Sequence, residues 1–112
     1  MKKAYKIEDK DIRPLLKNWI GADGCLVTDK IMVDGCKVGY MYRDNPINAF
    51  DSGWRFFEGN ESSGYINNPE NLSAPKLNTL CNYDPDVLPF LKEAEGSAFK
   101  RNAAGFFEKT DE

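Results

Sequence analysis

Carboxylates, arginine and aromatic residues gather in one segment of this chain, DSGWRFFEGNESSGY at positions 51–65. Four acids in or beside it could offer oxygen ligands to Mg²⁺ or Ca²⁺, namely Asp44, Asp51, Glu58 and Glu61. Their spacing does not match a calcium-binding loop, in which ligands recur at alternate positions. A solvated acidic surface explains them better, so we expect no metal site.

A second set of acids could perform acid–base chemistry. Asp84 and Asp86, together with Glu61, would supply the two carboxyl groups that glycosidases need. Both aspartates flank Pro85, however, and turn or helix-capping roles account for them better. The chain has no histidine, which removes the commonest general base and any Cys–His pair. The glycines of segment 51–65 form no phosphate-binding motif. We therefore expect no catalytic residues, no enzyme activity and no cofactor.

Arg43 and Arg55 are the cations of most interest, because each lies next to aromatic residues in a predicted strand. Two guanidinium groups could grip a carboxylate of a partner molecule. Alternatively, Arg55 pairs inside the protein with Asp51 or Asp84 and stacks on an aromatic ring. Internal pairing is the more usual state of an arginine within a strand, and the sequence leaves both interpretations open.

The bulk properties indicate one folded domain, residues 1–112. Apolar residues make up 41% and charged residues 29% of the chain, as in ordinary globular proteins. The net charge of −3 argues against a nucleic-acid partner. The three scattered cysteines predict reduced thiols and a cytoplasmic location. No apolar run is long enough for a signal peptide or a membrane span, so we expect no membrane partner.

Hydrophobic periodicity predicts two elements in the first part of the chain. Residues 11–21 carry apolar side chains at helical spacing, which predicts an N-terminal helix. Residues 25–43 predict a β-hairpin around Asp34-Gly35, a pair typical of two-residue turns. In that register Tyr40 and Tyr42 point inward, whereas Met41 and Arg43 face solvent.

The remaining elements follow from shorter patterns. Residues 54–58 read as a strand with Trp54 and Phe56 on one side and Arg55 and Phe57 on the other. The other expected elements are a helical turn within 61–66, a strand at 76–83, a short helix within 84–96 (centred on 85–93) and a closing hairpin formed by 97–101 and 105–109. This order predicts an α+β fold with a mostly antiparallel sheet.

Four blocks resemble, in the same order, the immunity-protein-33-like family of bacterial domains. They are GCLVTDKIMVDGCKVGYMYRD, DSGWRFFEG, LNTLCNYDPDVLPFL and EGSAFKR, and they extend from about Gly24 to Arg101. The motif residues that carry over are 42–43, 51–56 and 82–86. The family is assigned to polymorphic toxin systems, in which a small cytoplasmic protein binds and blocks a cognate toxin. The resemblance thus implies a non-catalytic protein-binding module with a toxin protein as its partner.

We expect a surface patch to bind the toxin. In this patch the Trp54 face anchors the strand in the protein, and Arg55 and the acidic residues contact the toxin. Its members are Arg43, Asp51, Trp54, Arg55, Glu58 and Asp84. A small-molecule or metal-binding domain built on Arg55, Asp51 and Asp84 is the alternative, and a pocket where Arg55 and Asp84 converge would favour it. A homodimer whose aromatic residues form the subunit interface is a second alternative.

Overall fold

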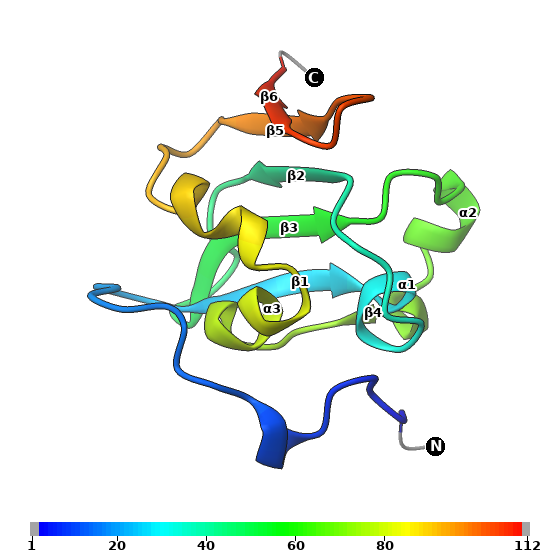
Figure 1. Ribbon diagram of the computed structural model, residues 1–112, viewed down its shortest axis with the longest axis horizontal. Helices are drawn as coiled ribbons and strands as arrows, with labels where there is room; N and C mark the ends of the chain where they lie inside the picture. The colour runs from blue at the N-terminus through cyan, green and yellow to red at the C-terminus, as the bar shows by residue number, and fades with distance from the viewer. Residues whose placement is uncertain (1–2, 111–112) are drawn as a thin grey trace.

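Six strands form one sheet in the order β4-β1-β3-β2-β5-β6 (Figure 1). The structure is a computed structural model that describes residues 3–110. β1 and β3 are parallel, and the other neighbouring strands are antiparallel. The strands are β1 (Gly24–Thr28), β2 (Tyr40–Arg43), β3 (Asp51–Phe57), β4 (Leu72–Ser73), β5 (Ala98–Arg101) and β6 (Phe107–Lys109). The predicted α+β fold with a mostly antiparallel sheet is confirmed.

One face of the sheet is covered by α3 (Leu77–Tyr83) and the 3-10 helix η3 (Pro85–Phe90), which lie in front of it in Figure 1. Side chains alternate along a strand, so every second residue points to this face. Those residues form the core together with the apolar side of α3: Cys25, Val27, Met41, Trp54, Phe56, Phe99, Leu77, Leu80 and Cys81.

Two short helices lie at one end of the sheet, at the right in Figure 1. α1 (Asp29–Met32) begins directly after β1, where the hydroxyl of Thr28 accepts a hydrogen bond from the Lys30 N–H and caps the helix. α2 (Ser63–Ile66) is capped in the same way by Ser62. Two further 3-10 helices are η1 (Asp9–Asp11) and η2 (Pro69–Asn71).

The predicted N-terminal helix is wrong, because residues 12–23 form neither helix nor strand. Pro14 cannot donate a backbone hydrogen bond, and side chains of α3 take the bonds that a helix would use. Asn78 accepts from the backbone N–H groups of Leu15 and Leu16 at 2.8 and 2.9 Å. Asn82 accepts from the N–H of Arg13 at 2.9 Å. The segment is therefore held extended against α3.

The predicted hairpin of residues 25–43 is also wrong, because β3 lies between β1 and β2 in the sheet. Asp34 and Gly35 instead follow α1, and Gly35 has a φ of +81°. Without the hairpin the faces of β2 are reversed. Met41 is fully buried, whereas Tyr40 and Tyr42 lie on the opposite face of the sheet.

Residues 77–83 form the helix α3 and not the predicted strand. The helix predicted within 84–96 is present as η3, and the carboxylate of Asp84 caps it by accepting from the Asp86 N–H. The strand predicted at 54–58, the helical turn within 61–66 and the closing hairpin are confirmed as β3, α2 and β5–β6.

Candidate protein-binding surface

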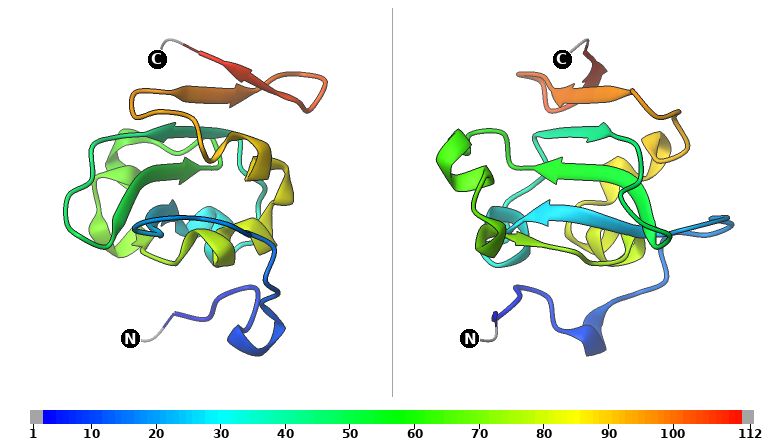
Figure 2. Two further views of the ribbon diagram at one scale, coloured as in Figure 1. Left: turned by 90° about the vertical axis from the view of Figure 1, so that its left-hand side faces the viewer. Right: turned by 180° about the vertical axis from the view of Figure 1, so that it is seen from behind.

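The second face of the sheet is open. Seen from behind (Figure 2, right), β1, β3, β2 and β5 lie in front of the covering helices, and no helix among residues 3–110 crosses in front of β2 or β3. Strand pairing places Tyr42 beside Arg55, and Tyr40 between Phe57 and Lys100. These side chains therefore belong to the open face.

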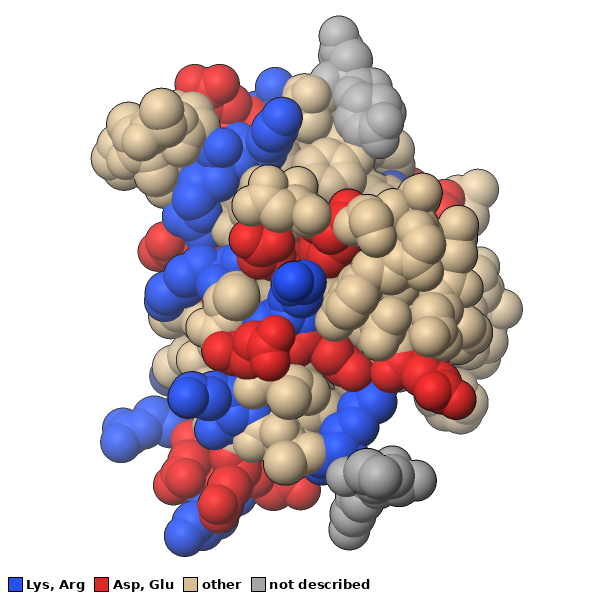
Figure 3. Space-filling model, turned by 90° about the vertical axis from the view of Figure 1, so that its right-hand side faces the viewer, with Lys and Arg blue, Asp and Glu red and all other residues tan. Residues whose placement is uncertain are grey.

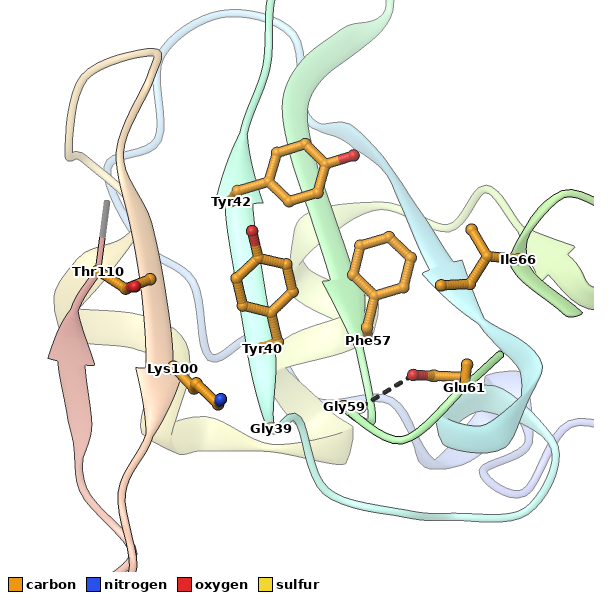
Figure 4. Close-up of a pocket in the computed structure, with 9 residues that line it drawn as sticks. All are labelled: Gly39, Tyr40, Tyr42, Phe57, Gly59, Glu61, Ile66, Lys100 and Thr110. Carbon is orange, nitrogen blue, oxygen red and sulfur yellow. Dashed lines mark hydrogen bonds between the residues drawn. The ribbon is translucent and has the colours of Figure 1, made fainter. Parts of the chain in front are cut away.

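Three aromatic rings form the centre of this face, which we call the aromatic surface: Tyr40, Tyr42 and Phe57. The rings lie beside one another over β2 and β3 (Figure 4), with centroids 5.7, 5.8 and 6.1 Å apart. The planes of Tyr42 and Phe57 differ by only 14°. All three side chains are partly exposed and line a cavity of about 520 Å³. The sequence patterns did not predict this surface.

Charged side chains flank the aromatic surface on opposite sides (Figure 4). Glu61 accepts hydrogen bonds from the N–H groups of Glu58 and Gly59 at 2.8 and 2.9 Å. Burial alone would raise the pKa of Glu61, but these bonds outweigh it and lower the pKa below its ordinary value. Glu61 therefore carries a fixed negative charge. Lys100 lies on the other side, where its strand partner is Glu108.

Asp51 and Arg55, two of the expected patch residues, form a buried ion pair on the open face. The guanidinium donates to both carboxylate oxygens at 2.9 and 2.8 Å. Only 7% of Asp51 and 5% of Arg55 is exposed. The hydrogen bond from Arg55 is the main cause that lowers the pKa of Asp51 to about 2. Of the two interpretations of Arg55, the structure contains the internal pair with Asp51.

Arg43 and Trp54 lie together on the helix-covered side. Trp54 has no exposed surface, and its Nε1 donates to the carbonyl of Leu91 at 2.9 Å. The guanidinium of Arg43 lies 5.9 Å from the Trp54 ring and 5.5 Å from the Trp19 ring. It also donates to the carbonyls of Ser52 and Glu93. This arrangement ties the end of β2 to the segment that follows η3.

Asp84 is fully buried at the N-terminal end of η3. Its carboxylate accepts from the Val38 N–H at 2.9 Å and from the guanidinium of Arg101 at 2.6 Å. Asp84 therefore lies on the helix-covered side, whereas Arg55 lies on the open face. The structure does not bring Arg55 and Asp84 together in one pocket. Of the six expected patch residues, Arg55 pairs with Tyr42 of the aromatic surface in the sheet. Glu58 follows Phe57 in the chain, and its carboxylate accepts hydrogen bonds from Asn60.

Charge is uneven over the surface beside the aromatic residues. The side that carries α1 and α2 faces the viewer in Figure 3, where acidic side chains form a band across it with Lys and Arg side chains above and below the band. Residues 62–68, which include α2, carry no charge and form an uncharged area beside this band. Asp34 and Glu70 are exposed acids of this part of the chain. Within residues 3–110, no cluster of three acids and cysteines could hold a metal ion.

The fold and the surface define a small α+β domain with one helix-covered face and one open aromatic face. The family model of the Immunity protein Imm33 domain matches residues 25–111 of the sequence, and the chain belongs to this family. The resemblance of the four sequence blocks is thereby confirmed. Neither the curated proteins nor the solved structures contain a match to the chain. Among the described residues, no helix is long and apolar enough to cross a membrane.

Proposed function

We propose that this chain is an immunity protein that binds a cognate bacterial toxin and blocks it without catalysing a reaction. The observation that supports the proposal is the aromatic surface, where Tyr40, Tyr42 and Phe57 lie partly exposed on a sheet face that no helix among residues 3–110 covers. Tyrosine and phenylalanine are enriched in protein interfaces, and tyrosine is frequent among the residues that dominate binding energy. Because the chain belongs to the immunity family, the partner that we propose is a toxin protein.

Steric occlusion is the mechanism that fits this geometry. A rigid sheet face that covers a toxin's active site needs no catalytic group of its own. The acidic band beside the face would speed the encounter with a basic toxin and select against acidic proteins. The three free thiols suit the reducing cytoplasm, which we propose as the site of action.

The expected patch residues acquire different roles in this proposal. Glu58 contributes negative charge directly after Phe57 in the chain. Asp51 and Arg55 lie on the open face and support the aromatic surface beside Tyr42, because their ion pair fixes the start of β3. Arg43, Trp54 and Asp84 act from the helix-covered side as the framework of the sheet. Direct contact with the toxin is thus proposed for the aromatic surface and Glu58.

Affinity capture from the native host tests the proposal. Tagged wild-type protein should retain one partner in stoichiometric amount, identified by mass spectrometry. Tyr42→Ala and Phe57→Ala should each lose it, while circular dichroism shows an intact fold. Phe106→Ala is the matched control, because Phe106 is 70% exposed but lies in the turn between β5 and β6. Equal capture by all three variants would rule out the aromatic surface as the binding site.

The cavity of about 520 Å³ supports a second candidate function, the binding of a small molecule. This small-molecule site differs from the site expected from the sequence, because Tyr40 and Tyr42 line the cavity in place of Arg55, Asp51 and Asp84. A thermal-shift screen against metabolites would detect such a ligand. Measuring the mass of the protein in solution tests the remaining alternative, a homodimer.

A further inference from the structure

The aromatic surface has a chemical character beyond being apolar. Its three rings lie beside one another over the sheet, and each lines the same cavity. The face of an aromatic ring carries partial negative charge and attracts cations, and tyrosine and phenylalanine both act in this way. Three neighbouring rings therefore offer a platform for a flat cationic group.

Glu61 adds negative charge to this platform. Glu61 lies in the cavity wall, and its carboxylate is held by the N–H groups of Glu58 and Gly59. Because Glu61 already accepts these bonds and a further one from Thr28, it acts chiefly through its charge. Lys100 is a cation at the opposite side of the cavity, and its strand partner is Glu108. The guanidinium of Arg55, beside Tyr42, is neutralised by its ion pair with Asp51.

We propose that the aromatic surface accepts an arginine side chain of the partner, whose guanidinium lies flat over Tyr42 and Phe57, the two rings whose planes differ by 14°, with the ring of Tyr40 tilted beside them. A guanidinium is planar and weakly hydrated and stacks on aromatic faces, whereas the lysine ammonium is compact and strongly hydrated. The negative charge of Glu61 and the net charge of −3 complement the cation. The inference deepens the proposed function and rests on it for the identity of the partner.

Peptide titration of the intact protein tests the inference without the toxin. The probes are a capped Gly-Arg-Gly peptide and the same peptide with citrulline, the uncharged analogue of arginine. NMR should show shifts localised to Tyr40, Tyr42 and Phe57 that saturate at millimolar peptide. The arginine peptide should bind roughly two- to fivefold tighter than the citrulline peptide, as for an exposed cation–π contact.

The variant Tyr42→Leu/Phe57→Leu retains apolar bulk but removes two aromatic faces. We expect it to fold and to bind the arginine and citrulline peptides equally, and Phe106→Leu should behave as the wild type.

Equal binding of both peptides by the wild type, or shifts elsewhere, would overturn the inference. So would shifts at the aromatic surface caused by raising the protein concentration alone, which indicate a second copy, or tighter binding of adenosine than of arginine. Affinity capture distinguishes failure of this inference from failure of the proposed function. If the wild type captures a toxin and Tyr42→Ala does not, the proposed function stands even when the arginine peptide does not bind.

Discussion

Arg55 donates two hydrogen bonds to Asp51, a residue four positions earlier on the same strand, at 2.9 and 2.8 Å. In a regular strand residues four positions apart are separated by about 13 Å. A bulge shortens this separation: Gly24 pairs with Asp51 and Leu26 with Arg55, so two positions on β1 match four on β3. Gly53, with a φ of +95°, lies within the bulge and donates its N–H to Asp51. The ion pair and the bulge therefore depend on each other.

Arg55→Ala should lower the free energy of unfolding by about 3–5 kcal/mol, because Asp51 would remain buried without its partner. Urea denaturation at pH 7 measures the change. Arg13→Ala is the control: Arg13 is exposed, and its loss should change stability by less than about 0.5 kcal/mol. A stable Arg55→Ala protein that no longer binds its partner would instead assign Arg55 to the interface.

The pKa of Asp51 predicts a specific loss of stability in acid. The ion pair lowers this pKa from 3.8 to about 2, so the folded state favours the ionised form. The resulting stabilisation is complete above pH 3.8 and is lost as the pH falls towards 2. It amounts to about 2 kcal/mol. Urea titrations at successive pH values should show this slope in the wild type and a flatter one in Asp51→Asn. Equal slopes in the two proteins would show that the fold does not lower the pKa of Asp51.

Gly53→Ala should destabilise the protein more than Gly96→Ala, although both glycines have a φ of +95°. At Gly96 an added Cβ meets nothing within 4 Å, so only backbone strain of about 1–2 kcal/mol is expected. At Gly53 the Cβ would lie 2.1 Å from the carbonyl oxygen of Asp44. The bulge must then move, which should cost a further 1–3 kcal/mol or so. Thermal unfolding of the two variants separates the cost of backbone strain from the cost of the steric collision. Equal losses of stability in both variants would show that the collision costs nothing.

Local patterns predicted the elements that local interactions determine. The alternation of Trp54 and Phe56 with Arg55 and Phe57 identified β3, and the turn after Arg101 identified the β5–β6 hairpin. The N-terminal segment failed because its backbone hydrogen bonds go to Asn78 and Asn82, more than 60 positions away. Periodicity within residues 11–21 contains no information about such distant partners.

The aromatic surface was missed because of a single turn. Asp-Gly supplies the positive φ that a hairpin requires, but the same conformation also follows the end of a helix. Thr28, which caps α1, was the signal for the second possibility. Assuming a hairpin reversed the faces of β2 and placed Tyr40 and Tyr42 inside. The alternation of Tyr40, Met41 and Tyr42, taken alone, would have left open which face is buried.

Salt should slow association with the toxin if the acidic band steers the encounter. Raising the salt from about 0.05 to 0.5 M shortens the Debye length from roughly 14 to 4 Å, so the association rate constant should fall while dissociation changes little. Glu58→Lys should reduce the association rate at low salt, because Glu58 directly follows Phe57 of the aromatic surface. Glu95→Lys makes the same change of charge in the exposed turn before β5, away from α2, and should have a smaller effect. Surface plasmon resonance measures both rates. Equal effects of the two variants would attribute steering to net charge alone, and rates independent of salt would exclude it.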